Sequence, residues 1–165
     1  MIRFADNFSE WVSRILLIVS CILLLAMMLH ITGDVARRFF FNRSLPATLE
    51  MVTYYYMVGA VFLAMAYVEK RGEHIRVDLF AQMFPRKFQL VLYIFGGLVC
   101  LLFFFLLAWQ GYVDAVRATD RGERVMSRYQ FYIWPSRWAI PVGIGALMLV
   151  VLSNMLKAIA RREAL

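Results

Sequence analysis

The chain has 165 residues, a formal net charge of +7, 62% hydrophobic residues and only 18% charged residues. Together with a mean hydropathy of +0.67, this composition excludes an ordinary soluble domain of that length. The cations are spread among short loops beside Trp and Tyr, which indicates anchoring at membrane headgroups and argues against nucleic acid as a partner.

Four long apolar runs predict an all-α integral membrane protein with a single membrane domain, 1–165. We expect transmembrane helices at about 15–36, 50–69, 88–113 and 136–157. Each run approaches or exceeds the roughly 20 residues that a helix needs to cross the hydrocarbon core. Helices satisfy their own backbone hydrogen bonds in lipid, whereas a membrane barrel would need alternating strands of about ten residues.

The first apolar run is expected to stay in the protein as a helix. Ile18 to Cys21 is similar to the short box before a lipidated cysteine, but the apolar run continues past it, whereas a cleaved signal should give way to polar sequence. Cys21 and Cys100 both lie inside expected spans. Their positions argue against a disulfide framework or a metal site.

Ionisable residues gather where the first helix ends. His30 and Asp34 are four residues apart on one helix face, and Arg37 and Arg38 follow. Such a cluster is costly in a membrane unless it is paired or hydrated, so it indicates either a proton or ion relay or, as the favoured interpretation, a clamp between helices. Glu50 opens the second helix at the same membrane face. We expect this carboxylate to pair with the two arginines.

Small residues in the second helix favour close contact with another helix. Gly59 and Ala60 are followed by Ala64, which forms a small-xxx-small pair with Ala60, although this common pattern can also arise by chance. Because lipid already solvates apolar side chains, membrane helices associate through such close packing. We expect this face to dock on a larger membrane partner.

The connection between the second and third helices predicts a short interfacial helix. Gly72 ends the second helix and Pro85 limits the segment, while the residues between them are strongly apolar with a polar edge. His74 and Asp78 are four residues apart in this segment. Two ligands without a third make a poor metal site, so a hydrogen-bonded loop staple is the favoured interpretation.

Several short motifs occur in a fixed order along the chain. They are Asp34-Val35-Ala36-Arg37-Arg38, Phe41-Asn42, Glu50, Gly59-Ala60, Glu73-His74-Ile75-Arg76-Val77-Asp78, Trp134-Pro135 and Ile140-Pro141-Val142-Gly143. In this order and spacing, across four helices, the chain resembles the small membrane subunit of TRAP (tripartite ATP-independent periplasmic) transporters, the DctQ-like or Q subunit. The most specific of these motifs is the one that ends at Asp78.

The resemblance implies a role that the composition does not reveal. A small subunit of this kind is expected to brace a large, M-type elevator subunit during sodium-driven uptake of organic acids delivered by a periplasmic binding protein. It implies a multi-pass protein of the bacterial inner membrane, in contact with phospholipids and with both termini in the cytoplasm. A slight excess of cations in the segments on the terminal side favours the same orientation.

Other classes of function find less support in the residues. No Ser–His–Asp, HExxH or CxxC pattern indicates an enzyme, and His30 and His74 are poorly placed for a bis-histidine haem, so we expect no cofactor. Neither a row of intramembrane charges nor a pair of broken helices indicates a self-sufficient carrier. A small four-helix assembly or regulatory factor of another complex is the alternative function.

Overall fold

The computed structural model describes residues 2–72, 85–125 and 130–161. The elements in these ranges are helices: α1 Ile2–Phe41, α2 Thr48–Met51, the π-helix η1 Val52–Met57, α3 Val58–Arg71, α4 Arg86–Asp120, α5 Trp134–Arg137 and α6 Ala139–Arg161. Four helical segments of the described chain are long and apolar enough to span a membrane: Asp6–Phe41, Thr48–Arg71, Val91–Asp120 and Trp134–Ile159. The predicted all-α membrane fold with four spans is confirmed.

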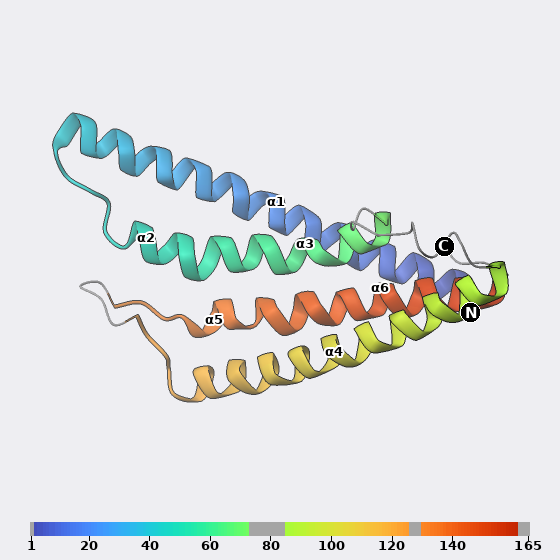
Figure 1. Cartoon of the computed structure of the whole chain (residues 1–165). Helices are drawn as coiled ribbons and strands as arrows, with labels where there is room; N and C mark the ends of the chain where they lie inside the picture. The colour runs from blue at the N-terminus through green and yellow to red at the C-terminus, as the bar shows by residue number, and fades with distance from the viewer. Residues whose placement is uncertain (1, 73–84, 126–129, 162–165) are drawn as a thin grey trace.

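The long helices lie side by side, and α6 holds the central position (Figure 1). Helix α6 contacts α3 on one side and α4 on the other, while α1 packs on α3 and also on α6. The start of α1 and the end of α6 lie at one end of the bundle, which we call the terminal end (Figure 1). The connections α1–α2 and α4–α5 lie at the opposite end, which we call the loop end.

Burial is concentrated on α6. Two clusters of buried side chains run along it, one with Ala66 of α3 and one that faces the partly buried Ile94, Leu101 and Phe104 of α4. By contrast, none of the most apolar stretch of α4 is buried. This inversion of soluble-protein packing is stable in a bilayer because lipid tails are as apolar as the side chains that face them.

Left-handed residues end three of the helices. Asn42, with φ 52°, follows α1, and Gly72, with φ 67°, follows α3, so the predicted helix end at Gly72 is confirmed. Gly122, with φ 57°, closes α4 in a Schellman motif, in which the N–H groups of Gly122 and Glu123 reach carbonyls 3.1 and 2.9 Å away in the last turn. These bonds satisfy carbonyls that would otherwise be unpaired at the helix end.

The helices extend beyond the apolar runs that predict them. Helix α1, for example, begins at Ile2 and ends at Phe41, because charged residues continue a helix where it leaves the hydrocarbon core. Pro135 lies at the start of α5 and Pro141 in the first turn of α6, where a missing N–H costs nothing. The short helix expected between the second and third spans lies outside the described residues.

Candidate functional site

At the terminal end, one carboxylate joins three helices. Asp6 of α1 forms ion pairs with Lys70 of α3 and Lys157 of α6, both through the same carboxylate oxygen. Lys70 also donates to the hydroxyl of Ser9 at 2.9 Å. We call Asp6, Lys70 and Lys157 the terminal node. Nothing in the sequence pattern singled out these residues, because lysines at helix ends are ordinarily headgroup anchors.

Serines form much of the buried face of α1. Ser13 and Ser20 are among the most buried side chains of the described chain. The hydroxyl of Ser20 donates to the carbonyl of Ala60 in α3 at 2.6 Å, and that of Ser13 donates to the Glu10 carbonyl of its own helix at 2.9 Å. Small hydroxyl side chains thus satisfy their hydrogen bonds while they let neighbouring helices approach closely.

Gly59 and Ala60 are buried inside the bundle, against α1. A Cβ atom on Gly59 would overlap the Leu23 side chain, and Ala60 receives the hydrogen bond from Ser20. The expected close helix approach is therefore present, but its partner is α1 of the same chain. The assignment of Gly59 and Ala60 to a surface that docks on a separate subunit is corrected accordingly.

At Gly143, α6 approaches the backbone of α3 closely. A Cβ atom there would lie 2.6 Å from the carbonyl carbon of Phe62 and would overlap the attached oxygen. Backbone atoms cannot swing aside as a flexible side chain does, so only glycine fits this contact. One of the residues singled out by the sequence motifs thus lies at the seam between two helices.

At the loop end, Asp34 anchors the α1–α2 connection. Its side chain is buried, accepts the backbone N–H of Leu45 at 2.5 Å and pairs with Arg38 at 2.9 Å. One turn earlier, Nδ1 of His30 lies 3.2 Å from the hydroxyl of Tyr56 in η1. Both interactions join the end of α1 to the segment that follows it.

The charge partner of Arg38 differs from the one expected. Arg38 pairs with Asp34 on its own helix, whereas the half-buried Glu50 makes no ion pair within the described residues, and Arg37 is exposed. The expected pairing of Glu50 with these arginines is therefore corrected. Asp34 is four residues from Arg38 on the same face of α1. The two side chains therefore meet however α1 is rotated about its axis relative to the other helices.

A hydrogen bond from η1 holds the second connection at this end. The hydroxyl of Tyr55 donates to the carbonyl of Tyr132, just before α5. Tyr132 in turn forms an isolated bridge with Arg124, whose guanidinium carbon lies 4.5 Å from the centre of the Tyr132 ring. Tyr55 of the π-helix thus links the second span to the connection between α4 and α5.

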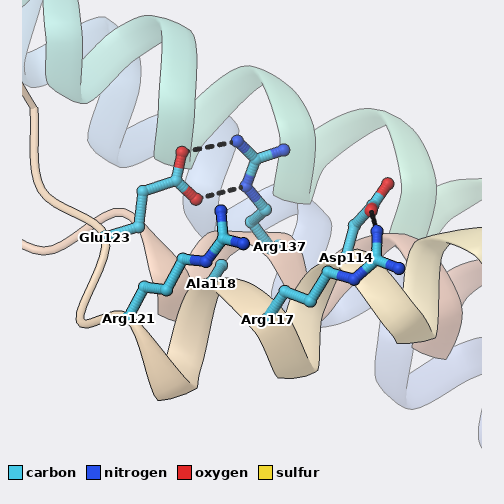
Figure 2. Close-up of a pocket in the computed structure, with 6 residues that line it drawn as sticks. All are labelled: Asp114, Arg117, Ala118, Arg121, Glu123 and Arg137. Carbon is cyan, nitrogen blue, oxygen red and sulfur yellow. Dashed lines mark hydrogen bonds and ion pairs between the residues drawn. The ribbon is translucent and has the colours of Figure 1, made fainter.

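Five charged side chains surround a cavity of about 410 Å³ at the end of α4. Figure 2 shows the six residues that line it: Asp114, Arg117, Ala118, Arg121, Glu123 and Arg137. We call this cavity the arginine pocket. Glu123 accepts two hydrogen bonds from Arg137, at 2.8 and 2.9 Å, a bidentate ion pair that ties α5 to the end of α4. The four-residue spacing of Arg117 and Arg121 can be recognised in the sequence. The pairing of Glu123 with Arg137 cannot be recognised there.

His74 and Asp78, the expected loop staple, lie outside the described residues. Within those residues, no group of three His, Cys, Asp or Glu side chains could hold a metal ion. The polar groups described above join helices and connections at the two ends of the bundle. The site of this chain is therefore a scaffold with a charged pocket at one end.

Comparison with protein families gives a match that covers most of the chain. Residues 27–161 match the family model described as tripartite ATP-independent periplasmic transporters, DctQ component. A comparison with curated proteins found no matching sequence. The matched range includes the loop-end residues and the arginine pocket, while Asp6 and the serines of α1 precede it.

Proposed function

The chain belongs to the DctQ component family of tripartite ATP-independent periplasmic transporters, and from this premise we propose that it braces a large, elevator-type membrane subunit. The large subunit would move organic acids with sodium, and a periplasmic binding protein would deliver them. The small chain would supply the fixed frame against which the moving part works.

The distribution of charge is the observation that supports a frame. Among the described residues, Asp34 is the only charged side chain that is buried, and it lies near the end of α1 with its partners in place. The interior of the spans is held instead by small residues and serine hydroxyl groups. A carrier needs polar groups or broken helices near the middle of the membrane, whereas a frame needs rigid seams.

The outer surface of α4 is suited to a membrane environment shared with a partner. Its exposed side chains include Leu98, Leu102, Phe105 and Leu106. Apolar side chains gain little by packing against another helix instead of lipid. The proposed complex would therefore depend on shape and on a few polar contacts as well as on apolar area.

The proposed orientation has the terminal end in the cytoplasm of a bacterial inner membrane. The terminal node would then face the cytoplasm, and the arginine pocket and both short connections would face the periplasm. The slight excess of cations on the terminal side supports this orientation, as does the expected arrival of the binding protein from the periplasm.

Uptake into proteoliposomes tests the proposal. A candidate large subunit, this chain, and both together are reconstituted with a periplasmic binding protein, an organic acid and an inward sodium gradient. We expect uptake only when both membrane subunits are present. Sodium-driven uptake by this chain alone would contradict the bracing role.

A second arm separates bracing from assembly. The large subunit is purified together with this chain, and the chain is then removed before reconstitution. A brace is required continuously, so we expect uptake to be lost and to return when the chain is added back. Full uptake after removal would instead identify an assembly factor.

A further inference from the structure

The arginine pocket contains more guanidinium donors than its carboxylates satisfy. The pair between Glu123 and Arg137 is complete, because both carboxylate oxygens accept hydrogen bonds. Arg117 lies 3.7 Å from Asp114, too far for a direct hydrogen bond. The guanidinium of Arg121 has no ion pair or hydrogen bond within the described residues. Three cations and two anions leave the pocket with an excess positive charge.

The unsatisfied donors are arranged to bind an oxyanion. Figure 2 shows the side chain of Arg121 extending from α4 towards Glu123 and Arg137, with Arg117 one turn away along the helix. A guanidinium presents five donors in a planar fork that matches the oxygens of a phosphate or carboxylate. Two such forks at one cavity favour a ligand that offers at least two acceptor oxygens.

The pocket is preformed around these forks. The Schellman motif satisfies the last carbonyls of α4, so Arg117 and Arg121 are not needed as helix caps. Val125 and Ile133 are buried beneath the connection, and the N–H of Ile133 donates to the carbonyl of Glu123 at 2.9 Å. A rigid pocket loses little conformational entropy when it binds a ligand.

Aromatic side chains place the pocket at the level of lipid headgroups. Trp109 and Tyr112 are 60% and 49% exposed on α4, and Trp138 donates from its ring N–H to the Thr119 hydroxyl at 3.2 Å. Amphipathic rings of this kind gather at the membrane–water interface. Arg117 comes five residues after Tyr112, or about 7.5 Å farther along the helix, where lipid phosphates lie.

An apolar strip leads from the hydrocarbon core to the pocket. Leu102, Leu106 and Trp109 are each about 60% exposed, and their spacing places them on the side of α4 that continues to Arg117. Acyl chains can lie along this strip while the phosphate meets the arginines. A free anion would gain nothing from the strip, so we infer that the arginine pocket binds the phosphate headgroup of an anionic phospholipid.

Lipid binding to the purified chain tests this inference without any measurement of transport. The full chain in neutral detergent is titrated with phosphatidylglycerol, phosphatidylcholine and inorganic phosphate, and bound lipid is measured by native mass spectrometry. We expect retention of phosphatidylglycerol in preference to phosphatidylcholine. The double variant R117Q/R121Q should bind phosphatidylglycerol about tenfold more weakly or worse, as the loss of charge-assisted hydrogen bonds predicts.

A matched control changes the same charge at the same end of the bundle. R37Q/R43Q removes one exposed arginine near the end of α1 and one in the α1–α2 connection, both outside the pocket, and should bind the lipid as the wild type does. Thermal unfolding without lipid should be the same for all three proteins. If R117Q/R121Q unfolds at a lower temperature, R121Q alone replaces it, because this guanidinium makes no bond within the described residues.

Four results would overturn the inference. They are undiminished lipid binding by the pocket variants, an equal loss of binding in R37Q/R43Q, displacement of the lipid by inorganic phosphate at similar concentration, and an absence of preference for phosphatidylglycerol in the wild type. Loss of binding-protein docking in R117Q/R121Q with lipid binding intact would assign the pocket to a protein ligand instead. None of these results depends on whether the chain braces a transporter.

Discussion

Helices α3 and α4 lie on either side of α6 but contact it in different ways. At Gly143, α6 touches the backbone of α3, and a Cβ atom there would lie 2.6 Å from a carbonyl carbon. At Gly97, α4 approaches α6 through a side chain, since a Cβ atom would lie 2.9 Å from the sulfur of Met155. The first contact is rigid, whereas the second can adjust by rotation of a flexible methionine. Apolar length alone therefore does not make a membrane helix tightly packed.

The ion pairs at the ends of α3 and α4 also differ, in how far they are exposed to solvent. In the terminal node the side chains of Lys70 and Asp6 are 11% and 27% exposed, whereas those of Arg137 and Glu123, beyond α4, are 39% and 35% exposed. Burial adds a desolvation cost to an ion pair as well as strengthening its Coulomb attraction, so the loss of one partner, which leaves the other charge uncompensated, costs more in a buried pair than in an exposed one. The loss of a charge in the terminal node should thus cost more than the loss of one in the Glu123–Arg137 pair.

The largest effect is expected for Gly143→Ala. The added methyl group would force the backbones of α6 and α3 apart, which should lower the free energy of unfolding by about 3 kcal/mol and the unfolding temperature by about 6 to 12 °C. Thermal unfolding in detergent measures the change. The control is Gly145→Ala, where a Cβ atom meets nothing within 4 Å. Equal stability of both variants would show that the two backbones are not in contact.

Asp6→Asn should destabilise the α3 side of the bundle by about 2 kcal/mol. The change leaves two partly buried lysines close together without their shared anion. Glu10→Gln is the matched control, since it breaks the exposed pair with Arg14 on the same helix and should cost less than about 0.5 kcal/mol. If the two variants unfold at the same temperature, the terminal node does not stabilise the bundle.

Glu123→Gln should have a smaller effect, about 1 kcal/mol, because the ion pair with Arg137 is bidentate but partly exposed to solvent. Unfolding temperature and the rate of proteolysis between α4 and α5 measure the change. Glu50→Gln removes a carboxylate at the same end that has no ion pair within the described chain. We expect this control to be neutral. A larger loss of stability for Glu50→Gln than for Glu123→Gln would show that Glu50, and not Glu123, makes the more important charged contact at the loop end.

The smallest effect is expected in the seam between α4 and α6. Gly97→Ala requires only a movement of the Met155 side chain, so its cost should stay below about 1 kcal/mol. Gly96→Ala meets no atom within 4 Å and gains helix propensity, which should leave stability unchanged or raise it by up to about 1 kcal/mol. A loss at Gly97 as large as that at Gly143 would remove the distinction between the two seams.

The helix ends illustrate what could be predicted locally. Gly72 has the positive φ that glycine permits, and it ends α3 where the sequence predicts. Pro135 and Pro141 lie in the first turns of their helices, where the ring is tolerated. These features depend on backbone sterics within a few residues, so they can be recognised without knowledge of any neighbouring helix.

The partners of polar residues could not be predicted in the same way. Arg38 and Glu50 are expected at one membrane face, yet the rotation of each helix about its axis decides which side chains meet, and Asp34 is the partner of Arg38. Gly59 and Ala60 likewise predict a close contact without predicting that α1 fills it. The terminal node is a stronger case, since residues 6, 70 and 157 share no local pattern.

The sequence by itself determined that this chain spans a membrane with four helices and resembles a transporter subunit, because hydropathy and chain breakers act over single helices. Only the tertiary structure decided that α6 is central, that serines form the buried face of α1, and that Glu123 closes a pocket with Arg137. Lipid solvates every apolar face about equally, so apolar pattern carries little information on which faces meet. Which helix faces meet is decided by close backbone contacts and by a few polar interactions between residues far apart in the chain.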